Sequence, residues 1–283
     1  MPQTLEHLND LDALEARLPE LTAQYAAGEP YPHITLEGLL RPEVLEQVYA
    51  EFDAVPAETW TNYLHLNERK YGHTDPSTWG PTLRGVLDEL SSDRFIAFLS
   101  AMTGIEGLQA DRSLDGGGLH RSLPGGFLNV HADFTAHHTR AGWRRRVNLL
   151  LYLNREWQPE WGGALELWSR DMRRCVSTVE PIGNRALVFT TDVDSYHGHP
   201  EPLRFPEGLA RQSLALYYFT DEPGLHPRST DYRARPGDGP KRALIFLDKS
   251  ALRVYDALKR RLHLSDGVVS RALGAVMARR SRR

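Results

Sequence analysis

The segments GFLNVHADF, residues 126–134, and RRVNLLLYLN, residues 145–154, decide the predicted fold. Both are rich in aliphatic and aromatic residues, and Gly or Asn marks one end of each. Such runs predict β-strands. Further runs of the same kind follow Leu108: GLHRSL (118–123), GALELW (163–168), RCVSTVEP (174–181), RALVFTT (185–191) and RQSLALYYFT (211–220). Many short strands at this spacing predict an all-β sandwich or barrel.

The flanking regions predict helices and loops. Residues 9–27 carry apolar side chains at helical spacing, Pro42 opens a second helix, and residues 82–103 look helical. Residues 55–81 show no period, so we interpret them as a long loop rich in polar and aromatic groups. A Pro/Gly-rich loop over 221–240 precedes a predicted return to helix. The fold class is therefore predicted to be α+β in a single domain, residues 1–283.

Composition excludes several classes of protein. The chain has 283 residues, of which 41% are hydrophobic and 25% charged, which is typical of a globular protein. The formal net charge of −3 disfavours nucleic acid as a partner. Cys175 is the single cysteine, which excludes an internal disulfide framework and fits a cytoplasmic location. We expect neither a signal peptide nor a transmembrane segment, because no long apolar run is present.

A candidate metal site lies in one of the predicted strands. His131 and Asp133 are two residues apart, so both side chains share a face of the strand. A third ligand must come from elsewhere, and His197 and His199 lie in the segment DSYHGHPEPL. Two histidines and a carboxylate form the facial triad of non-haem Fe(II), which leaves coordination positions open for a cosubstrate and O₂. A His-x-Asp pair alone also arises by chance.

The strand that begins at Arg211 contains a second candidate binding site, which supports the one at His131 and Asp133. Arg211 and Ser213 share one face of that strand. A guanidinium binds a carboxylate through two parallel hydrogen bonds, and a neighbouring hydroxyl adds a donor. The pair therefore predicts a receptor for the distal carboxylate of a small dicarboxylic acid. The alternative, a surface salt bridge, is disfavoured because the strand continues as the apolar run LALYYF.

Taken in order, these segments resemble the prolyl 4-hydroxylase-like branch of the 2-oxoglutarate/Fe(II)-dependent oxygenases. The resemblance covers roughly residues 108–220. It implies a double-stranded β-helix, or jelly roll, in which His131, Asp133 and His197 hold Fe(II) and Arg211 binds 2-oxoglutarate. His199 remains the alternative to His197. The resemblance favours His197, because the proline-containing segment comes after it.

The resemblance implies an Fe(II)- and 2-oxoglutarate-dependent dioxygenase. Such an enzyme uses O₂ to hydroxylate an unactivated C–H bond and converts 2-oxoglutarate to succinate. The substrate class implied is peptidyl proline, an amino-acid-like compound or another polar small molecule. Arg211 stands where prolyl hydroxylases commonly use Lys, which weakens the inference to proline. The alternatives are a cupin-like isomerase or hydrolase that uses no 2-oxoglutarate, and a non-catalytic binding module.

The resemblance also implies that the domain has three parts. Residues 1–107 are expected to form a helical support with a substrate loop, 108–220 the jelly-roll catalytic core, and 221–283 a loop and C-terminal helices. Ser213, Tyr152 and Asn129 are candidate 2-oxoglutarate ligands, although Tyr152 equally fits a buried structural tyrosine. Candidate substrate residues are His120, Trp60, Tyr63 and Asn67, and His120 also fits a histidine in a turn. The substrate, the oligomeric state and the role of the basic helix over 267–283 stay open.

Overall fold

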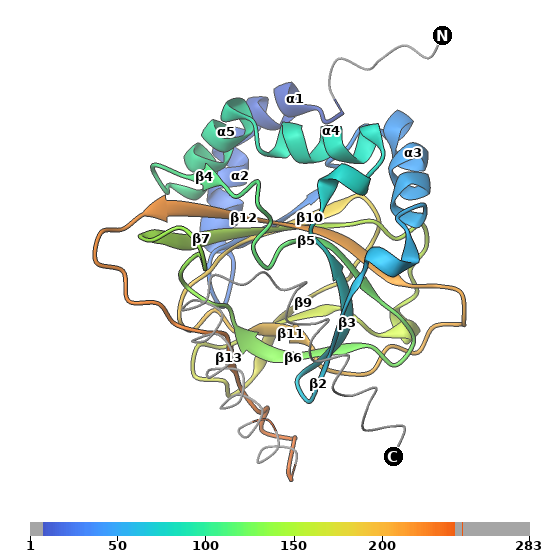
Figure 1. Cartoon of the computed structure of the whole chain (residues 1–283). Coiled ribbons are helices and arrows are strands. Elements are labelled where there is room, and N and C mark those ends of the chain that lie inside the picture. Colours follow the sequence, from blue (N-terminus) through green and yellow to red (C-terminus); the bar gives the residue numbers. More distant parts are fainter. Residues whose placement is uncertain (1–7, 241–244, 246–283) are drawn as a thin grey trace.

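The computed structural model describes residues 8–240 and Ile245. The helices of this part lie together over one face of a sheet (Figure 1). Pro19 at the start of α2 splits the helix predicted over 9–27 into two, while the predictions from Pro42 and over 82–103 are confirmed. The predicted C-terminal helices lie outside the described residues. The helices are α1 (Leu11–Ala16), α2 (Leu18–Ala27), α3 (Pro42–Asp53), α4 (Pro81–Leu90) and α5 (Asp93–Thr103), with 3-10 turns η1 (Ala57–Thr59), η2 (Pro76–Thr78) and η3 (Pro159–Trp161).

The strands form one antiparallel sheet that folds back on itself. Its order is β1-β10-β7-β12-β5-β3-β6-β11-β8-β9, and β2, β4 and β13 pair with β3, β12 and β6. β3 pairs with β5 at one end and with β6 at the other, so it joins the two layers (Figure 1). This arrangement confirms the predicted jelly roll. The strands are β1 (His33–Glu37), β2 (Thr61–His65), β3 (Glu68–His73), β4 (Gln109–Ala110), β5 (Gly118–Ser122), β6 (Phe127–Ala132), β7 (Trp143–Tyr152), β8 (Leu165–Trp168), β9 (Cys175–Val179), β10 (Arg185–Thr190), β11 (His197–His199), β12 (Arg211–Asp221) and β13 (Asp231–Tyr232).

Alternation along the central strands sorts side chains between two faces. In β7, Val147, Leu149 and Leu151 are buried in the core beneath the helices. Their neighbour Tyr152 belongs instead to a second cluster inside the barrel, with Leu165, Leu167, Leu187 and Phe189. Successive residues of a strand point to opposite faces, so this split follows from the pleat. Polar side chains on the inner face are thereby held within the barrel.

The prediction of a long loop over residues 55–81 is wrong. This segment contains a β-hairpin, β2 and β3, and β3 belongs to the main sheet. The hairpin turns polar side chains inward, including His65, Glu68 and Lys70, and leaves Leu64 exposed. A strand whose buried face is polar shows no hydrophobic period, so the sequence did not reveal it. The predicted loop over 221–240 likewise contains the two residues of β13.

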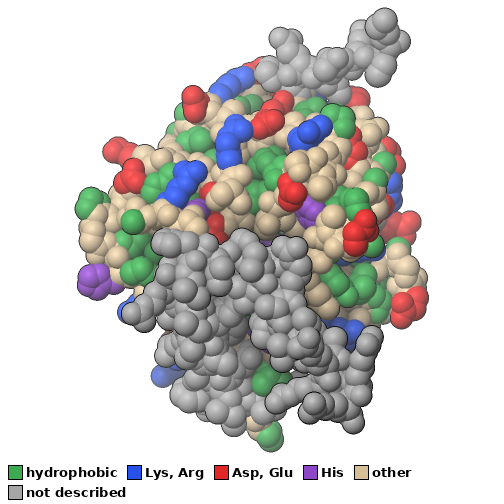
Figure 2. Space-filling model, in the orientation of Figure 1, with side chains coloured by type: hydrophobic (Ala, Val, Ile, Leu, Met, Phe, Trp, Pro, Cys, Tyr) green, Lys and Arg blue, Asp and Glu red, His purple; other side chains and the backbone are tan. Residues whose placement is uncertain are grey.

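The described surface offers no sign of a membrane span. None of the helices within residues 8–240 is both long and apolar enough to cross a bilayer. Acidic and basic side chains are interspersed over the helical half of the visible face (Figure 2). This mixture agrees with the net charge of −3.

Candidate functional site

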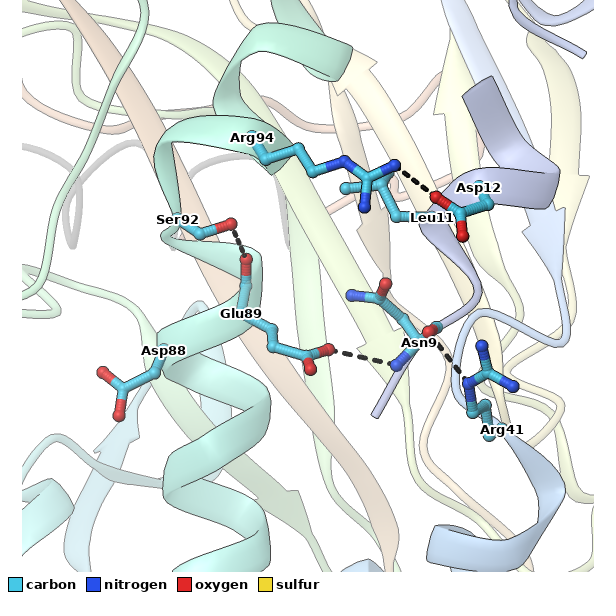
Figure 3. Close-up of a pocket in the computed structure, with 8 residues that line it drawn as sticks. All are labelled: Asn9, Leu11, Asp12, Arg41, Asp88, Glu89, Ser92 and Arg94. Carbon is cyan, nitrogen blue, oxygen red and sulfur yellow. Dashed lines mark hydrogen bonds and ion pairs between the residues drawn. The ribbon is translucent and has the colours of Figure 1, made fainter. Parts of the chain in front are cut away.

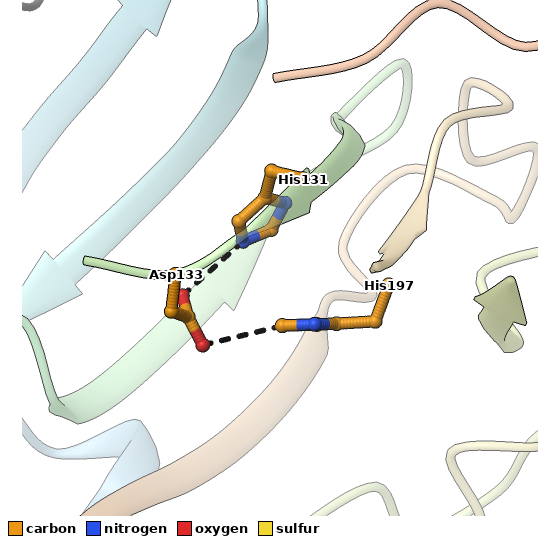
Figure 4. A group of neighbouring side chains, drawn as sticks. All are labelled: His131, Asp133 and His197. Atoms are coloured by element: carbon orange, nitrogen blue, oxygen red, sulfur yellow. Dashed lines mark ion pairs between the residues drawn. The ribbon is translucent and has the colours of Figure 1, made fainter. Parts of the chain in front are cut away.

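The described residues contain one group of side chains with the composition and spacing of a metal site (Figure 4). It consists of His131, Asp133 and His197, whose nearest ligand atoms all lie within 4.8 Å of one another. The two carboxylate oxygens of Asp133 lie 3.4 Å from Nε2 of His131 and 3.5 Å from Nε2 of His197. These are the three residues proposed from the sequence, and the fold brings them together.

The pairing of β6 with β11 places the two histidines side by side. His197 lies directly opposite His131 in this ladder, and their rings are 4.6 Å apart. Gly198 permits the approach, because a Cβ there would lie 2.7 Å from the carbonyl oxygen of Leu128. Asp133 follows the last residue of β6, so its carboxylate reaches the same space.

Backbone hydrogen bonds orient both imidazoles. Nδ1 of His131 donates to the carbonyl oxygen of Asn129 at 2.8 Å, and Nδ1 of His197 donates to that of Ser195 at 2.9 Å. These bonds leave each Nε2 as the atom that carries the free lone pair. Burial lowers the pKa of His197 to about 4 despite the opposing charge of Asp133. The ring is therefore neutral at pH 7, as metal binding requires.

A buried arginine that the sequence analysis did not single out holds the carboxylate of Asp133. Nη2 of Arg145 lies 3.0 Å from Oδ2 of Asp133, and Nδ2 of Asn148 donates to the same oxygen at 2.8 Å. Nε of Arg145 donates to Oδ1 of Asn148 at 2.7 Å, and its guanidinium stacks 3.3 Å from the centre of the Tyr217 ring. Burial alone would raise the pKa of Asp133, but Arg145 together with His197 and His131 outweighs burial, and the pKa lies well below its usual range.

Arg145→Met should destabilise the metal-free protein by about 3–5 kcal/mol, because it leaves a buried carboxylate without its cation. Arg146→Met is the matched control: Arg146 is only half-buried and donates one long hydrogen bond, 3.4 Å, to Thr220, so we expect less than about 1 kcal/mol. Denaturant unfolding of both variants without metal measures the difference.

The same pair predicts a pH dependence. The native pKa of Asp133 lies well below its unfolded value of about 4, so the ionised carboxylate stabilises the wild type above pH 4. This stabilisation is lost as the pH falls from the unfolded pKa through the native pKa. Without Arg145, burial raises the native pKa of Asp133. Protonation of this carboxyl group as the pH falls should therefore stabilise the Arg145→Met variant. The difference in unfolding free energy between wild type and Arg145→Met should narrow between pH 7 and pH 4. A constant difference would contradict the assigned ion pair.

Arg211 lies on the inner face of the barrel, in the position expected from the sequence. Its side chain is buried, and Nε donates to the carbonyl oxygen of Gly163 at 2.9 Å. Within the described residues, Nη2 of Arg211 and the hydroxyl of Tyr152 have no hydrogen-bond partner. The guanidinium lies 5.1 Å from the centre of the Tyr152 ring, and Ser213 is opposite Tyr152 in the ladder. The fold therefore groups three of the four candidate 2-oxoglutarate ligands.

Comparison with known proteins assigns this core. Residues 117–219 match the family described as the 2OG-Fe(II) oxygenase superfamily. Over these residues the chain is similar to the 2OG-Fe(II) oxygenases. The match contains His131, Asp133, His197 and Arg211, and it confirms the resemblance seen in the sequence. A search of curated proteins finds no match.

Solved structures share the fold of this chain. A prolyl hydroxylase from Trichoplax adhaerens, solved with a peptide fragment of the hypoxia inducible factor oxygen degradation domain, is similar with a TM-score of 0.55 and 16% identity, over 74% of this chain and 91% of that one. A prolyl 4-hydroxylase from Phytophthora capsici has a TM-score of 0.51 and 17% identity, over 92% of this chain and 79% of that one.

The residues of this site fit the iron and 2-oxoglutarate that the matched family uses. Two neutral imidazoles and one carboxylate are a donor set that suits Fe(II). The unpartnered Nη2 of Arg211 and hydroxyl of Tyr152 are donors that a buried carboxylate would satisfy. Burial lowers the pKa of Arg211 and raises that of Tyr152, as expected for groups enclosed by protein.

His199, the alternative ligand, does not belong to the group formed by His131, Asp133 and His197. Its ring is buried and its Nδ1 has no partner among the described residues. Burial, followed by the charges of Arg211 and Lys70, lowers its pKa well below the usual value. His199 therefore lies near the candidate cosubstrate residues.

The other sequence-derived candidates fall into two groups. Tyr63 and His120 face a common space, where a Cβ on Gly72 would lie 2.8 Å from the Tyr63 ring and 3.7 Å from the His120 ring. Trp60 instead packs against Phe52 in the core beneath the helices. Asn67 lies in the hairpin turn, where its Oδ1 accepts a hydrogen bond of 3.1 Å from Asn129. This hydrogen bond joins the hairpin to β6. Because the two side chains engage each other, we assign neither Asn129 to 2-oxoglutarate nor Asn67 to the substrate.

The protein surface also has a pocket of about 380 Å³ beside α4 (Figure 3). Its charged groups are engaged within the protein. Glu89 accepts from the backbone of Leu8 and Asn9, and Arg94 pairs with Asp12. The metal group lies elsewhere, inside the barrel, so this pocket offers no comparable chemistry.

Proposed function

We propose that this oxygenase binds Fe(II) through His131, Asp133 and His197, anchors 2-oxoglutarate through Arg211, and hydroxylates a C–H bond of a polar substrate. The observation that carries the proposal is the buried guanidinium of Arg211, whose Nη2 is unpartnered among the described residues. A buried cation that no carboxylate pairs with among the described residues costs free energy, so its retention points to an anionic ligand.

Arg211 and the metal group share one interior. Tyr152, beside Arg211, belongs to the same cluster as Phe189, and the ring of Phe189 lies 4.8 Å from that of His197. A small dicarboxylic acid held by Arg211 at one end would therefore extend toward the metal group. Ser213 and Tyr152 supply further donors for the distal carboxylate.

When bound, Fe(II) and 2-oxoglutarate supply O₂-dependent hydroxylation coupled to the conversion of 2-oxoglutarate into succinate and CO₂. The chain's own residues supply position and shielding. Arg145 and Asn148 fix the carboxylate of Asp133, and backbone carbonyls fix the two imidazoles. The apolar side chains of Leu165, Leu187 and Phe189 exclude water from the interior.

The substrate proposed is peptidyl proline, an amino-acid-like compound or another polar small molecule. A peptide is supported by the shared fold with the Trichoplax protein, which was solved with a peptide. Tyr63 and His120 are the residues proposed to contact substrate, because both face the interior beside the hairpin. A single domain and a cytoplasmic location complete the proposal, the latter supported by the single cysteine.

Succinate release by the purified protein tests the proposal. Anaerobic protein loaded with Fe(II) and 2-oxoglutarate is mixed with O₂ and a substrate panel of prolyl peptides, free amino acids and polar small molecules. We expect succinate formation that requires Fe(II) and is stimulated by at least one member. Metal-dependent turnover of a substrate without 2-oxoglutarate would instead favour the cupin-like alternative, which has no use for Arg211.

A further inference from the structure

An ion pair is buried on the inner side of the β2–β3 hairpin. Nζ of Lys70 lies 3.1 Å from Oε2 of Glu68, and the two side chains are 17% and 10% exposed. His65 accepts from the backbone N–H of Asn67 at Nδ1 and donates from Nε2 to Oε1 of Glu68 at 2.7 Å. Burial alone would raise the pKa of Glu68, but Lys70 and His65 outweigh it, so the carboxylate stays ionised.

This pair faces the same interior as the metal group. Glu68 lies opposite Leu128 on β6, the strand that carries His131, and Gly72 lies opposite His120 on β5. Burial and then the charge of Lys70 lower the pKa of His120 to about 3. Burial would lower the pKa of Lys70 as well, but Glu68 raises it, with a smaller contribution from Asp133. The ammonium is thus within electrostatic reach of both His120 and the metal-ligand carboxylate.

Lys70 keeps hydrogen-bonding capacity that the described residues do not use. An ammonium carries three N–H donors. Glu68 is the one described residue that pairs with it, and the Tyr63 ring, centred 5.6 Å away, offers only its face. A buried ion pair seldom stabilises a fold more than apolar side chains would. The donors that Glu68 does not engage on this largely enclosed cation are therefore available to a ligand that enters the interior.

The charges that surround the interior indicate the sign and size of that ligand. Three cations face it: Lys70, Arg145 and Arg211. Two carboxylates, Glu68 and Asp133, oppose them, while Glu180 and Arg185, which also act on the buried Tyr152, balance each other. Fe(II) and the 2-oxoglutarate dianion would cancel each other. One positive charge is left over, which a monoanion would neutralise and a phosphate dianion would overcompensate.

We propose that Lys70 binds a carboxylate group of the substrate, with Glu68 and His65 holding its ammonium in place. This inference rests on the proposed function, because the charge count includes the iron and 2-oxoglutarate. It narrows the substrate class to carboxylic acids, such as free amino-acid derivatives or chain-terminal residues. A residue inside a long peptide or an uncharged compound lacks the group that Lys70 would recognise.

Matched pairs of N-acetyl amino acids and their primary amides test the inference, with phosphate monoesters of similar size as a third set. Binding to the protein loaded with Mn(II) and 2-oxoglutarate without O₂ is measured by titration calorimetry. We expect at least one acid to bind about 10- to 100-fold more tightly than its amide, the range for one charge-assisted hydrogen bond. The double variant Lys70→Met/Glu68→Gln should abolish that preference without leaving an unpaired buried charge.

Arg69→Met is the matched control, since Arg69 is the exposed neighbour on the other face of β3 and carries the same charge. It should keep the preference for acids. The inference fails if no acid binds better than its amide, if phosphate monoesters bind most tightly, or if the preference survives in the double variant. It also fails if the double variant loses 2-oxoglutarate, because Lys70 would then serve the cosubstrate. Failure of the wild type to bind 2-oxoglutarate would instead reject the proposed function.

Discussion

Asp133→Ala and His131→Ala should each reduce succinate formation to background while leaving the fold intact. Loss of a residue that merely supports a metal ligand costs 10- to 100-fold in metal affinity, so loss of a ligand should cost at least about 100-fold. Metal binding is measured by Mn(II) titration, turnover by succinate release, and folding by near-UV circular dichroism. Succinate release at the wild-type rate in either variant would refute the assigned site.

Two further histidine variants sharpen this experiment. His197→Ala should behave like His131→Ala, because its Nε2 lies 3.5 Å from the carboxylate of Asp133. His199→Ala should retain Mn(II), because His199 does not belong to the metal group. His226→Ala, which removes an exposed imidazole, controls for the substitution itself. Loss of Mn(II) in His199→Ala but not in His197→Ala would reverse the assignment of the third ligand.

Arg211→Met should raise the dissociation constant for 2-oxoglutarate by about 100-fold, because two charge-assisted hydrogen bonds to the distal carboxylate are lost. Arg211→Lys keeps the charge but not the paired donors, so about tenfold is expected. Calorimetric titration of 2-oxoglutarate into Mn(II)-loaded protein measures both. Arg204→Met, an exposed arginine in the preceding loop, is the control.

The stability of these variants separates binding from folding. Nη2 of Arg211 has no partner within the described chain, and only the hydrogen bond from Nε to the carbonyl oxygen of Gly163 is lost, so replacement by Met should lower the unfolding free energy of the ligand-free protein by no more than about 1 kcal/mol. A variant that keeps its unfolding free energy and loses 2-oxoglutarate would identify Arg211 as a ligand-binding residue. Equal 2-oxoglutarate affinities in Arg211→Met and Arg204→Met would contradict that role.

Much of the site was predictable because it follows local rules. The pair His131 and Asp133 had to share a face of its strand, and so did Arg211 and Ser213. The strands of residues 108–220 were predictable from short apolar runs between turn residues. Residues 55–81 were not, because the inward side chains of that hairpin are polar.

Arg145 shows where strand alternation misleads. Its neighbour Arg144 pairs with the surface residue Glu222. In an unbroken strand, Arg145 and Asn148 would point to opposite faces, because they are three residues apart. The register of β7 and β12 shifts between Val147 and Arg145, and Arg145 therefore contacts Asn148 inside the barrel. Such a bulge turns a side chain to the other face without a hydrophobic signal in the sequence.

By itself, the sequence determined which segments of residues 108–220 become strands, which face each side chain takes in an unbroken strand, and two separate parts of the site, the pair His131 and Asp133 and the pair Arg211 and Ser213. Only the tertiary structure decided that β11 lies beside β6, that His197 rather than His199 completes the metal group, and that Lys70 and Arg145 point inward. The reason is physical. Side-chain alternation depends on the local backbone, whereas pairing, register shifts and the burial of a charge depend on residues far away along the chain.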